Sequence, residues 1–198
     1  EVVRRVADQV VVITGASSGL GRETALEFAR RGARLVLAAR STETLETLAR
    51  EIERLGGAAL AVRTDVGEAG DVAELARRAV ERFGRIDIWV NNAGVYLLGS
   101  LEATPPEAFR RVLETNFFGT VWVTQAVLPV LREQRTGTIL ATGSGAADSP
   151  MKGGATLGVQ KAALRALVQA LAADLRPEGI HAATVTVRGP LKEGTPLA

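Results

Sequence analysis

The feature that most constrains the fold is a glycine-rich segment that lies between an apolar run and a helical pattern. The run Val10-Val11-Val12-Ile13 leads into Thr14-Gly15-Ala16-Ser17-Ser18-Gly19-Leu20-Gly21, and the helical pattern continues to Arg31. Glycines let the main chain turn with positive φ and approach a ligand closely, and the amides of a helix N-terminus attract phosphate groups. We therefore expect a strand, a phosphate-binding loop and a helix here. A glycine-rich turn without a ligand is the alternative, and this strand and helix context argues against it.

Short apolar runs and amphipathic helical patterns alternate along the rest of the chain. The predicted strands are 10–14, 34–39, 58–63, 86–91, 138–142 and 181–187, and the predicted helices are 21–31, 42–55, 70–83, 104–134 and 155–175. Strands that are buried on both faces and joined by helices predict an α/β fold, a three-layer, doubly wound parallel sheet of the Rossmann type. We expect about six strands in the order 3-2-1-4-5-6, with the ligand at the carboxyl ends where the winding reverses.

Local signals predict where two helices begin and where one of them bends. Ser41 is expected to cap the helix over 42–55. Thr104 and Glu107 are expected to form a capping box around Pro105, the first helical residue of 104–134. Pro129 is expected to kink or split that long helix, because proline removes one of the helical hydrogen bonds.

Composition narrows the classes of function. The 198 residues, 46% hydrophobic and 23% charged, suit one domain over 1–198. Without cysteine the chain has no disulfides or thiolate chemistry, which fits a cytoplasmic location, and a lone histidine, His181, argues against a metal site or a Ser-His-Asp triad. The net charge of +2 without a basic block argues against a nucleic-acid partner. No apolar stretch approaches the ~20 residues that cross a bilayer, so no membrane partner is expected.

The spacing T-G-x-x-x-G-x-G, together with Asn92-Ala93-Gly94 after the fourth predicted strand, resembles the short-chain dehydrogenase/reductase family. The resemblance extends from Val10 to about Val187. It implies an oxidoreductase that uses a nicotinamide cofactor on a small carbonyl or alcohol substrate. It also implies that the Asn-Ala-Gly turn borders the ribose, that Asp65-Val66 contacts the adenine edge, and that the glycine loop holds the diphosphate.

The residues after the second predicted strand bear on the choice of cofactor. NAD sites of this architecture usually place an acidic residue there for the ribose 2′-hydroxyl, whereas this strand ends in Leu37-Ala38-Ala39-Arg40-Ser41. The guanidinium of Arg40 can pair with a 2′-phosphate, and Ser17 and Ser41 can add hydroxyl donors. We therefore predict NADP(H) in preference to NAD(H). The alternative is that Arg40 is a solvated arginine at a strand end.

The resemblance also assigns catalytic roles. In the family a tyrosine delivers a proton, and a lysine four residues later lowers the pKa of the tyrosine and holds the nicotinamide ribose. A serine after the fifth strand bonds the substrate oxygen, and an asparagine in the long helix supports a water-linked proton path. Ser144, Lys161 and Asn116 match these positions, but the tyrosine position holds Leu157.

Leucine has no proton to give, and general acid–base catalysis is worth about 10² to 10⁴ in rate. We therefore expect either an oxidoreductase with impaired or rerouted activity, or a non-catalytic NADP(H)-binding protein that serves as a sensor or assembly partner. Tyr96, the only tyrosine, is expected at the substrate pocket wall, without a lysine to tune its pKa. Thr156 points about 100° away from Leu157 on a helix. Lys161 itself, or a water molecule, remains an open alternative as proton donor.

The last part of the chain departs from the family pattern. The family commonly has Pro-Gly after the sixth strand and then a threonine, whereas this chain has Val187-Arg188-Gly189-Pro190 with Thr195 later. Arg188 either alters the nicotinamide end of the site or indicates a differently routed loop. Relatives continue with a substrate-loop helix and a seventh strand, which we expect to be absent here, leaving the sixth strand as an open edge unless a partner or a further segment covers it. Apolar faces around Phe117 and Leu167 resemble the dimer surfaces of the family, so we expect a homodimer or homotetramer.

Overall fold

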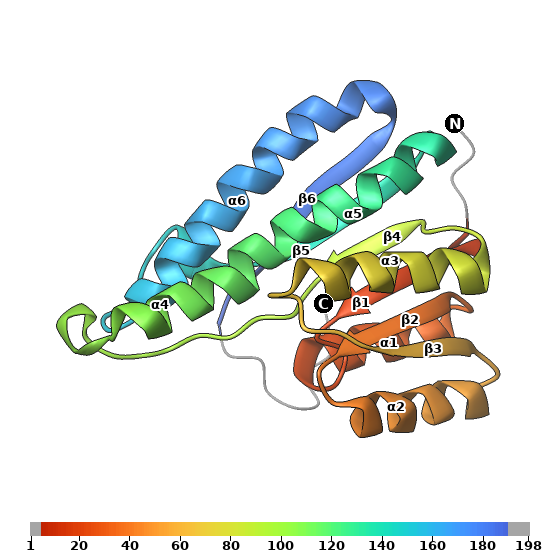
Figure 1. The fold of residues 1–198 in the computed structure, drawn as a ribbon, viewed down its shortest axis with the longest axis horizontal. Coiled ribbons are helices and arrows are strands. Elements are labelled where there is room, and N and C mark those ends of the chain that lie inside the picture. The colour runs from red at the N-terminus through yellow and green to blue at the C-terminus, as the bar shows by residue number, and fades with distance from the viewer. Residues whose placement is uncertain (1–4, 190–198) are drawn as a thin grey trace.

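A computed structural model describes residues 5–189 and contains a parallel six-stranded sheet of order β3-β2-β1-β4-β5-β6 with helices on both faces (Figure 1). The predicted fold class and strand order are therefore confirmed. The strands are β1 (Val10–Thr14), β2 (Arg34–Ala39), β3 (Ala58–Arg63), β4 (Ile88–Asn91), β5 (Gly137–Ser144) and β6 (Ile180–Val187). The helices are α1 (Gly19–Arg30), α2 (Thr42–Arg54), α3 (Ala69–Phe83), α4 (Pro106–Leu113), α5 (Gly119–Gln134) and α6 (Ala155–Leu175).

The sheet is buried between two helical layers. Val11 and Ile13 of β1 pack with α1 and α2 on one face, whereas Val10 and Val12 pack with α3, α5 and α6 on the other. Every residue of β1 is buried, as expected of a central parallel strand covered on both faces. Among the described strands β6 lies at one edge of the sheet. No helix within the described part of the chain is long and apolar enough to cross a membrane.

The long helix predicted over 104–134 breaks at a place that the sequence analysis did not identify. A π-helical turn, Glu114–Phe118, separates α4 from α5, whereas Pro129 lies inside α5 on an exposed position. The prediction that Pro129 splits the helix was wrong, since a proline on an exposed helix face can be accommodated without a break. The π turn contains Asn116, which is buried and bonds outside its own helix. Such turns interrupt helices frequently at functional sites.

The caps of two helices test the remaining local predictions. Ser41 precedes α2 and its hydroxyl accepts a hydrogen bond from the Thr44 amide at 3.4 Å, as predicted. The capping box before α4 was wrong: Pro105 is the N-cap residue, and no side chain bonds the free amides of that end. The Thr104 hydroxyl instead donates to the Ser100 carbonyl at 2.9 Å. The Thr104 hydroxyl is therefore bonded within the preceding turn and does not cap α4.

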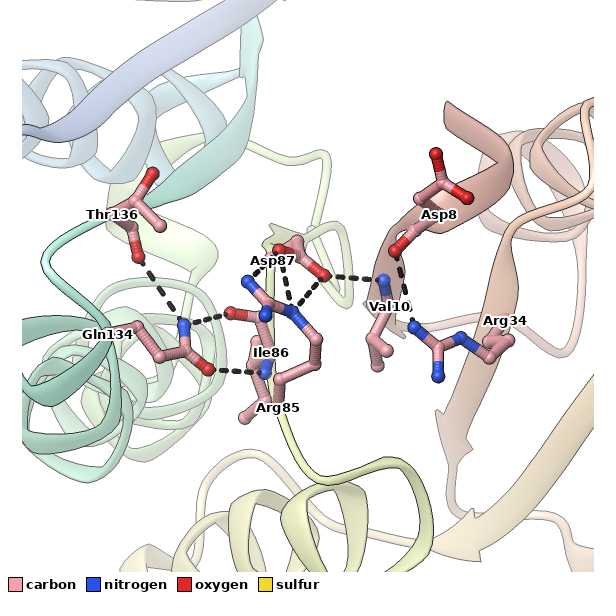
Figure 2. Close-up of polar contacts among 8 residues, drawn as sticks. All are labelled: Asp8, Val10, Arg34, Arg85, Ile86, Asp87, Gln134 and Thr136. Atoms are coloured by element: carbon pink, nitrogen blue, oxygen red, sulfur yellow. Dashed lines mark hydrogen bonds and ion pairs between the residues drawn. The ribbon is translucent and has the colours of Figure 1, made fainter. Parts of the chain in front are cut away.

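Polar side chains join the amino ends of β1, β4 and β5 (Figure 2). The glycine loop lies at the other end of these strands. The buried carboxylate of Asp87 accepts from the Val10 amide at 2.9 Å and pairs with Arg85 through contacts of 2.6–3.0 Å. The Gln134 amide bonds both the carbonyl and the amide of Ile86, at 2.7 and 3.1 Å. These contacts connect the sheet to the end of α5, away from any ligand.

We predict that Asp87→Ala lowers the free energy of unfolding by about 3 kcal/mol, because it leaves the Val10 amide and the Arg85 guanidinium without their buried acceptor. Urea denaturation followed by circular dichroism measures the change. Glu81→Ala is the control, since Glu81 is exposed and, in the part of the chain that the structure describes, pairs only with exposed Arg77. Equal denaturation midpoints for the two variants would contradict this role of Asp87.

Candidate functional site

The glycine loop after β1 is joined to the Asn-Ala-Gly turn after β4. The buried hydroxyl of Thr14 accepts hydrogen bonds from the amides of Asn92 and Ala93, both at 3.1 Å, and donates to the Val90 carbonyl at 3.3 Å. The Asn92 side-chain amide donates to the carbonyls of Thr14 and Gly15 at 3.2 and 3.3 Å. One threonine and one asparagine therefore fix the two loops against each other at the carboxyl ends of neighbouring strands.

Two glycines are required by this close approach. Gly15 has φ +66°, and a Cβ there would lie 2.7 Å from the Ala93 Cα atom. A Cβ on Gly21 would lie 2.2 Å from the Gly15 carbonyl oxygen and 2.5 Å from the Asn92 side-chain nitrogen. Distances of this size exclude a side chain at either position without rearrangement of the loop. The glycine spacing thus follows from packing of the loop on α1 and on the turn after β4.

The N-terminus of α1 opens above this loop. Ser18 is the N-cap residue with extended geometry, and its side chain bonds none of the first amides of the helix. Gly19 has φ +52°, and a Cβ there would meet no heavy atom within 4 Å. Ser17 and Leu20 are half-buried beside it. Uncapped amides and the positive end of the helix dipole face open space here, which is the arrangement that accepts an anion.

The residues after β2 and β3 lie at the carboxyl end of the sheet, as the glycine loop does. Arg40 is exposed, and within residues 5–189 no side chain or main-chain group forms an ion pair or hydrogen bond with it. The Asp65 carboxylate accepts from the Gly67 amide at 3.0 Å, which closes the turn after β3. Val66 is buried, and its carbonyl oxygen would lie 3.1 Å from a Cβ on Gly119.

A second set of contacts runs from α6 to the glycine loop. The Lys161 ammonium donates to the Thr142 carbonyl at 2.6 Å, and the Thr142 hydroxyl donates to the Asn92 side-chain oxygen at 3.2 Å. Because Asn92 in turn bonds Gly15, the lysine is connected to the loop across β5 and β4. Burial lowers the pKa of Lys161, since charge is disfavoured away from water. Within the described residues no carboxylate pairs with this lysine.

Asn116 holds the segment that follows the Asn-Ala-Gly turn. Its side-chain oxygen accepts from the Val95 amide at 2.8 Å, and its side-chain nitrogen donates to the Val95 carbonyl. The Gln160 side chain also donates to that carbonyl at 3.2 Å, and its own oxygen is buried without a hydrogen-bond partner among residues 5–189. The π turn before α5 is what directs Asn116 toward Val95, and Gln160 reaches the same peptide from α6.

The remaining predicted residues lie around this centre. Ser144 ends β5, and its hydroxyl accepts from the Ala146 amide at 3.2 Å. Leu157 is half-buried in the first turn of α6, one turn before Lys161. Tyr96 follows Val95 and is mostly exposed. The structure therefore brings the loops after β1, β4 and β5 together with α6, while Arg40 lies apart at the end of β2.

Arg188 follows β6 and lies beside the loop after β5. Its guanidinium is 4.0 Å from the Asp148 carboxylate, which also contacts Arg165 of α6. The aliphatic part of Arg188 lies 3.5 Å from the position of a Cβ on Gly145. Thr195, the other residue considered after the sixth strand, lies outside the described residues. No group of three or more acidic, histidine or cysteine side chains in the described ranges could hold a metal ion.

Sequence reasoning missed the side chains that connect these parts. Thr14 belongs to the glycine pattern, yet only the structure gives its hydroxyl a role between two loops. Thr142, Thr156 and Gln160 make contacts over 50 to 65 positions in sequence, and no local pattern marks such pairs. Their position at strand ends and on the inner face of α6 was the one signal that could have identified them.

The strand order and the glycine loop define a nucleotide-binding fold of the Rossmann type. The profile of the short chain dehydrogenase family matches residues 9–192. The chain belongs to this family.

Individual relatives agree with that assignment. An uncharacterized oxidoreductase of Listeria monocytogenes is 38% identical over 182 residues, which are 92% of this chain and 73% of that protein. The crystal structure of NAD+-bound xylitol dehydrogenase is similar with a TM-score of 0.90 at 30% identity, covering 94% of this chain and 73% of the other. The 3-ketoacyl-(acyl-carrier-protein) reductase from Brucella melitensis, complexed with NADH, has a TM-score of 0.86 at 33% identity, over 91% and 75% of the two chains.

Proposed function

We propose that this chain is an NADP(H)-dependent oxidoreductase of carbonyl or alcohol substrates, with activity limited by Leu157. The observation that carries the proposal is the joined arrangement of the uncapped α1 N-terminus, the Thr14–Asn92 contacts and Lys161. Family membership supports a nicotinamide cofactor, and two similar structures are described as bound to NAD+ and NADH. When bound, such a cofactor supplies or accepts the hydride.

Residues of the chain fit the parts of that cofactor. The open space above Gly19 suits a diphosphate against the first amides of α1. Asn92, Ala93 and Gly94 would border a ribose, and the turn at Asp65 and Val66 would border the adenine. Lys161, held by Thr142, would bind the ribose next to the nicotinamide.

We predict that Gly19→Ala weakens NADP+ binding about tenfold or more, because its Cβ would occupy the space of a phosphate and the loss of one charge-assisted hydrogen bond is of that size. Isothermal titration calorimetry measures the affinity. Gly56→Ala is the matched control: Gly56 also has positive φ, at +81°, and open space, but lies after α2. Both variants place a side chain at a positive φ, so equal NADP+ affinities would contradict a diphosphate at α1.

Arg40 supports the preference for NADP(H). Its guanidinium is exposed and has no partner among the described residues, so it is available to a 2′-phosphate. We predict that Arg40→Leu lowers affinity for NADP+ by about 10- to 100-fold and leaves that for NAD+ unchanged, as measured by calorimetry. Arg54→Leu, the same change at the opposite end of α2, should alter neither. Equal affinities of the unmodified chain for NADP+ and NAD+ would refute the preference.

The chain's own residues can orient a carbonyl substrate. The Ser144 hydroxyl lies at the carboxyl end of β5 and can donate to a carbonyl oxygen. Burial keeps the pKa of Lys161 low, which eases release of its proton, and its ammonium favours a negative oxygen nearby. By register with the family motif, Leu157 stands where a proton donor is expected, and leucine provides none.

We predict that Leu157→Tyr raises NADPH-dependent carbonyl reduction by about 10²-fold or more, because it restores a general acid one helical turn from Lys161. Anaerobic NADPH consumption across a panel of aldehydes and ketones measures the gain. Leu157→Phe is the control for ring size without the hydroxyl, and Lys161→Met in the tyrosine background should abolish the gain.

Leu157 also favours a second function for this chain. If Leu157 reflects lost chemistry, the chain is a non-catalytic NADP(H)-binding protein that acts as a sensor or assembly partner. This function predicts NADPH binding with no gain in the Leu157→Tyr variant. That result would remove the proposal of a latent reductase site while leaving the cofactor proposal intact.

We also propose that two or four copies of the chain associate through α5 and α6. Phe117 and Leu167, around which apolar faces were predicted, are half-buried. By contrast, Phe118 at the π turn and Val159 on α6 are apolar and exposed. Phe118 stacks on Trp122 of α5 with ring centroids 5.9 Å apart, which gives this face a rigid aromatic surface. Such exposed apolar side chains suit contact with a second copy.

A further inference from the structure

We propose that the substrate of this site carries a bulky, uncharged apolar body beside its carbonyl group, and that residues 95–101 with Met151 form the wall that receives it. This inference rests on the proposed function, because it specifies the substrate of the same site. For the rest of this subsection these residues are called the apolar wall. The apolar wall follows the turn after β4. In the view of Figure 1 this segment runs below α4, and it meets the start of α6.

The wall exposes far more apolar surface than a solvated loop requires. Tyr96, Leu98 and Leu101 are 62%, 60% and 64% exposed, and Met151 is 56% exposed. No charged residue occurs from Asn92 to Leu101. Exposed apolar side chains that follow one another without a charge are more typical of a binding site than of a free surface, and pockets for small molecules are lined mainly by such side chains.

Side chains from two helices hold the wall in an extended course. Both main-chain groups of Val95 bond Asn116. Both main-chain groups of Leu97 bond the buried Thr156 hydroxyl, at 2.6 and 3.3 Å. The Gly99 amide donates to the Gly153 carbonyl at 2.8 Å. Alternate residues are therefore anchored by their backbone.

Because extended residues alternate in direction, this anchoring makes Tyr96 and Leu98 point to one side. They are more exposed than Val95 and Leu97, at 36% and 42%. A preformed wall loses little conformational entropy when a ligand binds. The apolar wall is thus held in a shape that can receive a ligand. Residues far apart in the sequence provide the contacts that hold it.

The apolar wall lies next to the residues of the reaction site, so we assign it to the substrate rather than to another ligand. Thr156 anchors Leu97 and is adjacent to Leu157, and Gln160 anchors Val95 and is adjacent to Lys161. The bridge between Gly99 and Gly154 brings Met151 to the same place at the start of α6. A carbonyl that reaches Ser144 and Lys161 would have the rest of its molecule beside this wall. The Asn116 and Gln160 contacts also join the wall to the site directly.

The test measures binding by calorimetry with NADP+ bound, so it needs no turnover. The probes are 1-decalone, a bicyclic uncharged ketone, and pyruvate, a small charged one. We expect 1-decalone to bind at least about tenfold more tightly than pyruvate, since the transfer of several apolar carbons from water provides that difference. Leu98→Ser should weaken 1-decalone binding about fivefold or more. Leu55→Ser, at an equally exposed leucine after α2, should leave it unchanged.

Three results would overturn the inference. Equal affinity for the two ketones would remove the preference for an apolar body, and equal losses in Leu98→Ser and Leu55→Ser would show nonspecific adsorption. A change of mass in light scattering for Leu98→Ser, with 1-decalone affinity intact, would assign the wall to contact between copies. NADP+ binding without 1-decalone binding contradicts this inference alone, whereas failure to bind NADP+ contradicts the proposed function beneath it.

Discussion

The hydrogen bonds of the Thr14 hydroxyl are the interaction on which the rest of the site depends. They join the loop after β1 to the turn after β4 without using the first amides of α1, which the Ser18 side chain also leaves uncapped. Together with the bonds from the Asn92 side chain to the carbonyls of Thr14 and Gly15, they give directional support to the close packing of Gly15 on Ala93, which backbone contact alone does not provide. A phosphate site needs amides that are held in place yet unpaired, and a buried side chain that bonds the neighbouring loop provides both conditions.

The fold was predictable because the central strands, above all β1 and β2, are buried on both faces. Continuous apolar runs such as 10–14 admit few arrangements, and the six predicted strands occupy the predicted order. The break in the long helix was not predictable, because its cause is distant. Proline at 129 gives a local signal but lies exposed, whereas the π turn accompanies the contacts of Asn116 with Val95, 21 positions away. Helix propensities carry no information about such a partner.

The candidate site, like the fold, was predictable only in part. Glycine spacing located the loop in advance, and the resemblance to the family pointed to the Asn-Ala-Gly turn and Lys161. The contacts between them run through Thr142, Thr156 and Gln160, which are ordinary residues at those sequence positions. Their hydroxyl and amide groups become specific only once α6 packs beside β5. A single sequence therefore identifies the groups that could touch a ligand more readily than the groups that orient them.

Lys161 gives a physical reason to regard the site as a binding site rather than a remnant. Lys161 is half-buried, and its ammonium bonds one carbonyl, with no carboxylate partner among the described residues. Burial of a charge without a partner costs stability, and an apolar residue of similar length would avoid that cost. Stability alone therefore does not account for a lysine beside Leu157. Under the proposed function, a ligand with hydroxyl or phosphate oxygens would supply the acceptors that the described residues leave out.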